Sequence, residues 1–144
     1  MARKPRARPE PRPQIGGRTI DSEAFRTRSE DRVVGFSFAM CDKNRYELRA
    51  WKDEELAGFI DKCRIVESLS WHEACRHKGL GIESIRRSEF PLPLQQVMNT
   101  LLSPDVQCVY EFRATIESRV FGVKSERIFS VLWFDRGHDI FPKA

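Results

Sequence analysis

The last third of this 144-residue chain alternates apolar and polar positions in three successive runs, at 106–113, 118–124 and 127–134. Strict alternation with β-branched and aromatic residues predicts β-strands, so we expect an antiparallel meander here. Ser125 and Glu126 are the expected turn between the second and third runs, and this turn sets the register of the two strands. A slip of one residue would move every side chain to the other face. The predicted pairs are Arg119 with Leu132, Phe121 with Ser130, and Val123 with Ile128.

Two further strand patterns lie before the helical part of the chain and after the meander. Residues 33–40 and 46–51 alternate on either side of the turn-forming residues 42–44, which predicts a β-hairpin. After the meander, residues 135–137 predict a turn and residues 138–141 a last short strand.

Between these strands the spacing of apolar residues becomes helical. A helix is predicted to about Ser68, with Asp53 as its N-cap and an apolar stripe of Leu56, Phe59, Ile60, Cys63 and Val66. Ser70 and Glu73 form a capping-box pattern that predicts a second, short helix, closed at Gly79 by a left-handed glycine. The tight connection predicts an αα-hairpin.

The segment that joins the second helix to the meander carries weaker patterns. Residues 79–90 have no clear assignment, and Pro91 and Pro93 exclude a long regular element there. Residues 94–102 predict one or two helical turns, ended at 103–105. The whole order predicts one α+β domain over residues 31–144, with a two-helix hairpin packed on an antiparallel sheet.

Charge sets residues 1–30 apart from the rest of the chain. They carry eight Lys or Arg against four Asp or Glu, whereas the other 114 residues carry 17 of each sign. Four prolines and five basic residues within residues 1–13 predict a disordered basic arm, which either solubilises the protein or contacts nucleic acid. The domain itself is neutral, which limits non-specific binding to phosphates.

Several functional classes find no support in the residues. The chain has no phosphate-binding glycine motif, no zinc-protease motif, no nucleophile elbow and no apolar run of the roughly 20 residues that cross a membrane. His72, Cys75 and His77 lie in one short helix, but residue 77 is rotated away from residue 75, which disfavours a zinc site. Widely spaced cysteines predict free thiols in a cytoplasmic protein.

The polar residues on and beside the meander suggest a chemistry that needs no metal and no cofactor. RNA cleavage requires a base for the 2′-hydroxyl, a cation on the phosphate and an acid for the leaving oxygen. Arg119 and His138 are the catalytic candidates, Arg113 and Arg136 are candidates for phosphate binding, and Asp135 is a candidate to assist. Alternatively, the arginines only border the sheet and Asp135 ties a turn with His138.

These residues also carry a resemblance to a known superfamily. Phe112-Arg113, the segments 119–122 and 129–135, and then His138 and Phe141-Pro142 resemble the end of RelE/ParE-like toxins, and small phage and bacterial proteins with a similar aromatic ending. Such toxins have a strand arginine before a β-hairpin and finish on a strand that carries His or Tyr. Phe141 stands where many of them have a tyrosine.

The resemblance implies an mRNA endoribonuclease that acts on RNA at the ribosome or free, held inactive by a partner antitoxin. By position, Arg119 would stabilise the phosphate and His138 would act as acid or base. The alternative is a non-catalytic protein- or nucleic-acid-binding module on the same scaffold, from a phage or mobile element. The nuclease hypothesis requires Arg119 and His138 to converge on one open groove.

Overall fold

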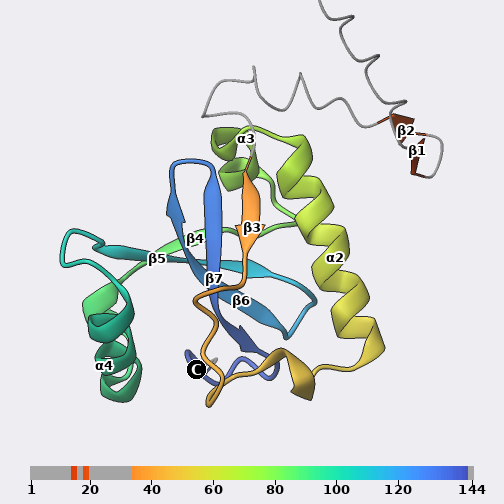
Figure 1. Ribbon diagram of the computed structural model, residues 1–144. Helices are drawn as coiled ribbons and strands as arrows, with labels where there is room; N and C mark the ends of the chain where they lie inside the picture. Colours follow the sequence, from red (N-terminus) through yellow and green to blue (C-terminus); the bar gives the residue numbers. More distant parts are fainter. Residues whose placement is uncertain (1–13, 16–17, 20–33, 143–144) are drawn as a thin grey trace, which may run out of the picture.

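The computed structural model describes residues 14–15, 18–19 and 34–142. These residues form an α+β fold with an open five-stranded mixed sheet of order β3-β7-β6-β5-β4, and three α-helices (Figure 1). The predicted basic arm lies largely outside the described residues. Within it, only the two-residue strands β1 (Gln14–Ile15) and β2 (Arg18–Thr19) are described, and they pair antiparallel.

The predicted meander is confirmed, and its three strands form the centre of the sheet. It consists of β5 (Cys108–Arg113), β6 (Arg119–Ser125) and β7 (Ile128–Asp135), all antiparallel. The predicted register is wrong, because Glu126 and Arg127, rather than residues 125 and 126, form the turn, with Ser125 opposite Ile128. A bulge between Phe121 and Gly122 then shifts the pairing further, which puts Phe121 opposite Trp133 and Arg119 opposite Asp135.

The predicted N-terminal hairpin is wrong. β3 (Gly35–Ser37) pairs in parallel with β7, and the 3₁₀ helix η1 (Leu48–Ala50) occupies the position of the predicted second strand. The connecting chain follows β7 instead of turning back on β3. The Trp51 indole donates to the Phe134 carbonyl at 3.3 Å, and the Phe134 amide donates to the Tyr46 carbonyl at 2.9 Å. Tertiary contacts with β7 thus override the local alternation.

Helices α2 (Asp53–Ser68) and α3 (Trp71–Arg76) form where the spacing predicts them. The capping box is confirmed, since the Glu73 amide donates to Ser70 Oγ at 3.1 Å and the Ser70 amide to Glu73 Oε1 at 3.3 Å. Two details differ: Lys52 rather than Asp53 is the N-cap, and Ile60 is 55% exposed outside the buried stripe.

The connection from α3 to the meander contains a strand and a helix. The left-handed glycine is Gly81, with φ +56°, rather than Gly79. β4 (Glu83–Arg86) pairs antiparallel with β5 at the sheet edge and is followed by the 3₁₀ helix η2 (Arg87–Glu89) and by α4 (Leu92–Leu101). Both prolines lie at the start of α4, at its N-cap and in its first turn, where a missing N–H costs no helical hydrogen bond.

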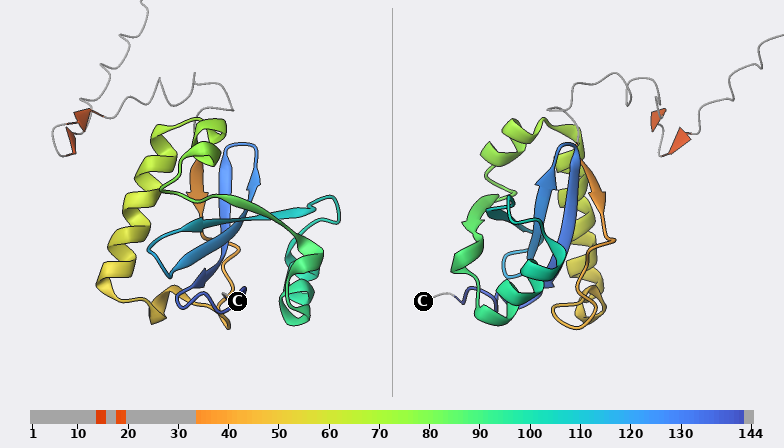
Figure 2. Two further views of the ribbon diagram at one scale, coloured as in Figure 1. Left: turned by 180° about the vertical axis from the view of Figure 1, so that it is seen from behind. Right: turned by 60° about the vertical axis from the view of Figure 1, so that its left-hand side comes forward.

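The helices cover the two faces of the sheet unequally (Figure 2). Helices α2 and α3 lie on one face, over a core that includes Phe59, Phe112 and Phe129. On the other face α4 covers one part, over a second core that includes Met98, Phe121 and Trp133. The last strand predicted at positions 138–141 is wrong, because the chain there forms only bends after the turn at residues 136 and 137. The partly covered second face positions the candidate site.

Candidate functional site

A cavity of about 470 Å³ opens on the second face of the sheet, beside the part that α4 covers. Strand alternation places residues 111 and 113 of β5 on this face. Their cross-strand partners complete the floor, since Glu83 lies opposite Glu111 and Arg119 opposite Arg113. The turn after β7 supplies the remaining wall. The lining residues are Glu83, Ile85, Glu89, Glu111, Arg113, Arg119, His138 and Phe141.

Arg119 and His138 therefore line one open cavity, as the nuclease hypothesis requires. The Arg119 side chain, however, is only 4% exposed and already has several partners. Nη1 donates to the carbonyls of Thr115, Ile116 and Ser118 at 3.0, 2.9 and 3.1 Å, and Nε lies 3.5 Å from Glu111 Oε1. Arg119 thus holds the β5–β6 loop and pairs a buried carboxylate.

Glu111 is the buried acidic residue of this cavity, and the sequence analysis missed it as a candidate. Its side chain is 10% exposed, and burial raises its pKa, against the opposing effect of the Arg119 charge. The neighbouring Glu83 carboxylate raises this pKa further, and His138 lowers it. A carboxyl group with a raised pKa can exchange a proton closer to neutral pH than an ordinary glutamate. The signal in the sequence was a glutamate two residues from Val109, on the same buried face of an alternating strand.

His138 lies in a strained turn whose geometry Asp135 determines. Asp135 is fully buried, and its two carboxylate oxygens accept the amides of Asp139 at 2.9 Å and Ile140 at 2.8 Å. His138 itself has φ +62°, a left-handed conformation that is uncommon outside glycine. Its Nδ1 atom is buried and has no hydrogen-bond partner in the described residues. Buried polar atoms without a partner are rare in proteins, which marks this turn as a candidate for function.

The two arginines predicted to bind phosphate lie in different places. Arg113 is exposed, lines the cavity and makes no ion pair within the described part of the chain. Its side chain crosses Gly81, where a Cβ atom would lie 2.8 Å from the arginine Nε. Arg136 lies outside this cavity and pairs with Glu55 at 2.7 Å.

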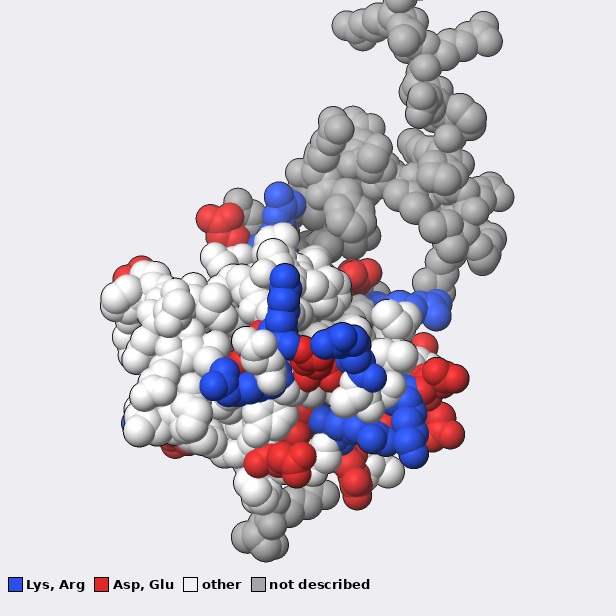
Figure 3. Space-filling model, turned by 60° about the horizontal axis from the view of Figure 1, so that its bottom comes forward, with Lys and Arg blue, Asp and Glu red and all other residues white. Residues whose placement is uncertain are grey.

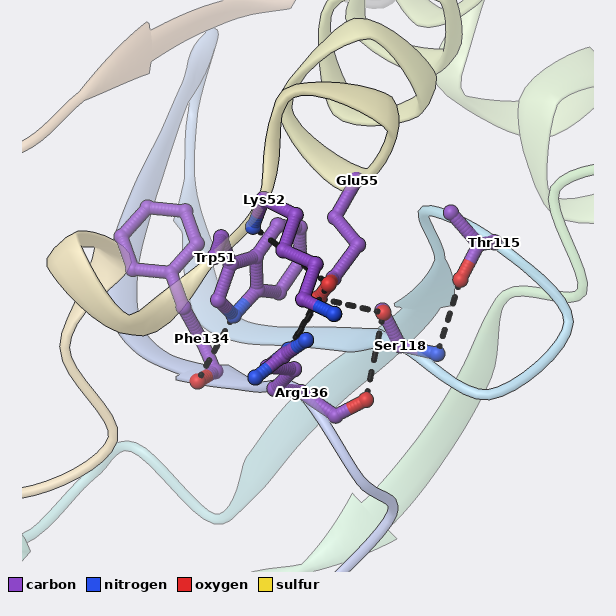
Figure 4. A network of polar contacts seen from close by, with 7 residues as sticks. All are labelled: Trp51, Lys52, Glu55, Thr115, Ser118, Phe134 and Arg136. Atoms are coloured by element: carbon purple, nitrogen blue, oxygen red, sulfur yellow. Dashed lines mark hydrogen bonds and ion pairs between the residues drawn. The ribbon is translucent and has the colours of Figure 1, made fainter.

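The ion pair of Arg136 belongs to a separate polar network at the start of α2 (Figure 4). Ser118 Oγ donates to the Arg136 carbonyl at 3.2 Å and lies 3.4 Å from Glu55 Oε2. Burial would raise the pKa of Glu55, but the hydrogen bond and the charge of Arg136 outweigh it and lower this pKa. This network joins α2 to the turn after β7, and so it supports the position of His138 from outside the cavity.

The charge around the site is mixed rather than basic. Three glutamates, two arginines and one histidine line the cavity. Seen from the lower end of the molecule, Lys and Arg side chains alternate with Asp and Glu beside a wide uncharged area (Figure 3). Among residues 14–15, 18–19 and 34–142, no group of three or more His, Cys, Asp or Glu side chains is placed to hold a metal ion.

The arrangement can support acid–base chemistry at an anionic centre. Glu111 and His138 are two proton-exchanging groups on one cavity, and Arg113 is a cation on the same surface.

No helix in the described residues is long and apolar enough to cross a membrane. Comparison of the chain with protein-family models, with curated proteins and with solved structures gives no match.

Proposed function

We propose that this protein is an RNA endonuclease of the RelE-like toxin class, in which the cavity between β4, β5 and the turn after β7 holds the scissile phosphate. One observation carries the proposal: Glu111, His138 and Arg113 line a single open cavity. They supply the base, the acid and the cation that cleavage by the 2′-hydroxyl requires.

The reaction proceeds by transfer of the 2′-hydroxyl proton to the ionised Glu111 carboxylate as the 2′-oxygen attacks phosphorus. The bond from phosphorus to the 5′-oxygen breaks, and the protonated His138 imidazole donates a proton to that oxygen. The products are a 2′,3′-cyclic phosphate and a 5′-hydroxyl. Arg113 donates to the phosphate oxygens, on which negative charge increases in the transition state.

In this proposal Arg119 has a different role from the one that the resemblance implies. Its Nη1 and Nε atoms contact loop carbonyls and Glu111, so Arg119 is a positioning residue that orients the base. Arg113, whose guanidinium has no ion-pair partner in the described residues, takes the phosphate. Asp135 holds the His138 turn through two backbone amides.

The test is cleavage of a short end-labelled RNA by the purified full chain. We expect Glu111→Gln, His138→Ala and Arg113→Ala each to reduce the rate by about 10²- to 10⁴-fold, and the product to end in a 2′,3′-cyclic phosphate. Arg64→Ala is the matched control for Arg113→Ala, because Arg64 is exposed on α2, which lies on the other face of the sheet. Equal losses in both arginine variants, or no cleavage by the wild-type protein, would refute the proposal.

A toxin should also arrest growth when its expression is induced in a bacterial host. Growth arrest that is lost in the Glu111→Gln and His138→Ala variants would support the toxin role, and release of the arrest by a co-expressed neighbouring gene product would identify the antitoxin. Unimpaired growth at a high level of wild-type protein would contradict this part of the proposal.

A second candidate function is a non-catalytic module that binds a partner protein. It is favoured by an apolar cavity of about 500 Å³ that Phe38, Cys41, Leu48 and Phe134 line, in which Phe38 is 51% exposed. If this function is correct, growth inhibition will persist in His138→Ala and be lost in Phe38→Ser. If the protein is an endonuclease, growth inhibition will be lost in His138→Ala and persist in Phe38→Ser.

A further inference from the structure

We infer that the same cavity recognises a guanine base on the 5′ side of the scissile phosphate, with Glu89 as the residue that reads the base. The inference rests on the proposed function for the position of the phosphate. It concerns the end of the cavity that lies away from Glu111 and Arg113.

The lining residues separate into two groups along the sheet. Glu111 and Arg113 lie at one end, while Ile85 pairs with Val109, two residues back along β5. Two strand residues span about 7 Å, a separation that one nucleotide can bridge from its phosphate to its base. The second group consists of Ile85, Glu89 and Phe141.

Phe141 offers an aromatic surface held in place by other rings. Its ring lies 4.9 Å from that of Phe90, edge to face, and 6.1 Å from that of Phe121. Phe90 and Phe121 are buried in the core beneath α4, so the Phe141 ring has a rigid support. Unstacked RNA bases bind to proteins by stacking on such aromatic side chains and by hydrogen bonds at their Watson–Crick edges.

The carboxylate of Glu89 determines which base edge fits beside this surface. An ionised carboxylate only accepts hydrogen bonds. Guanine presents two adjacent donors, N1–H and the N2 amino group, whereas adenine and cytosine place an acceptor beside their donor and uracil flanks its single donor with two carbonyls. Guanine is therefore the only base whose two adjacent donors can bind both carboxylate oxygens without bringing an acceptor lone pair of the base against them.

The contacts of Glu89 leave it available for this role. Oε2 accepts the Arg86 amide at 3.1 Å, which orients the carboxylate, and Oε1 has no partner in the described residues. Glu83, in the same cavity, adds negative potential that disfavours base edges with acceptors. A cavity that bound phosphate alone would not be expected to have three glutamates in its lining.

The experiment compares four RNA oligonucleotides that differ only in the nucleotide 5′ of the cleaved bond. We expect the wild-type chain to cleave after guanine about 10- to 100-fold faster than after adenine, in line with one bidentate contact to a base. Glu89→Gln should reduce this ratio to less than about 3-fold, through slower cleavage after guanine. The matched control is Glu117→Gln, since Glu117 lies in the β5–β6 loop outside this cavity and should retain the ratio.

Binding of 3′-nucleotides separates this inference from the proposed function. Guanosine 3′-phosphate should bind the full chain about 10-fold more tightly than adenosine 3′-phosphate, and Glu89→Gln should remove the difference. Cleavage with no base preference would overturn the guanine inference and leave the endonuclease standing. Preferential guanosine binding without any cleavage would do the opposite, and failure of both binding preference and cleavage would overturn both.

Discussion

Arg119 allows the clearest test of the reasoning, because the structure gives it a different role from the one that its position in the sequence indicates. Replacement by methionine keeps an unbranched side chain of similar length and removes the guanidinium. The variant loses the hydrogen bonds to three loop carbonyls and the contact with Glu111. We therefore expect its main effect to be on folding stability.

The magnitude follows from burial. Hydrogen bonds from a charged group contribute about 1.5–3 kcal/mol each, but carbonyls of an exposed loop can regain water, so the three do not add fully. Removal of one partner of a buried ion pair costs about 3–5 kcal/mol. We expect the free energy of unfolding to fall by about 3–5 kcal/mol, a large part of the 5–15 kcal/mol typical of a whole domain. At roughly 4 °C per kcal/mol, the Tm should fall by about 12–20 °C.

The assay is urea denaturation at neutral pH, followed by tryptophan fluorescence, on wild type, Arg119→Met, Glu111→Gln and the double variant. The double variant should lose less stability than the sum of the single variants, because each single change leaves a buried polar partner. A loss below about 1 kcal/mol in Arg119→Met, together with lost RNA cleavage, would refute the structural role. That result would instead make Arg119 a direct phosphate ligand.

Three further predictions concern single residues. Burial raises the pKa of Glu111 in the folded state, so its stabilising contribution is present below the unfolded pKa and is lost as the pH rises through the folded pKa. The Glu111→Gln variant should therefore gain stability relative to wild type as pH rises, and a pH-independent difference in urea denaturation would contradict this. Gly122→Ala should destabilise by about 3 kcal/mol, because a Cβ would collide with the Ser130 carbonyl; a normal denaturation midpoint would show that the bulge relaxes. Ser70→Ala should cost about 1 kcal/mol through loss of the α3 cap, and thermal unfolding unchanged from wild type would show that the cap contributes nothing.

The parts of the fold that the sequence predicts are those whose stability is local. Helices α2 and α3 and the three strands of the meander combine a clear period with short connections, so the pattern and the final structure agree. The parts that it does not predict depend on distant contacts. β3 pairs with a strand more than 90 residues later, and β4 is a charged edge strand that only its pairing with β5 defines. The register between β6 and β7 differs from the prediction first because the turn lies at residues 126 and 127, and then because of a bulge, which is a tertiary feature without a reliable local signature.

In the candidate site, too, local features can be predicted from the sequence and features that depend on distant contacts cannot. The position of His138 beside a strand arginine is readable from the meander, and the structure places both residues on one cavity. Burial cannot be read from the sequence. It is burial that directs the Arg119 guanidinium to backbone carbonyls and raises the pKa of Glu111. An acidic residue at an inward position of a strand could have been selected as a candidate, because an ionised group on a buried face is unfavourable without a partner or a function.

The cavity contains polar groups that a purely structural sheet face would not need. A sheet face that served stability alone would be more stable with apolar residues than with a buried Glu111–Arg119 pair. The face also contains a histidine in a left-handed conformation, which costs about 1–2 kcal/mol, and its buried Nδ1 has no partner in the described residues. These unfavourable features meet at one cavity, while α4 covers the rest of the face with an ordinary apolar core. Destabilising groups that gather where the sheet is open are typical of a site at which a ligand completes their interactions.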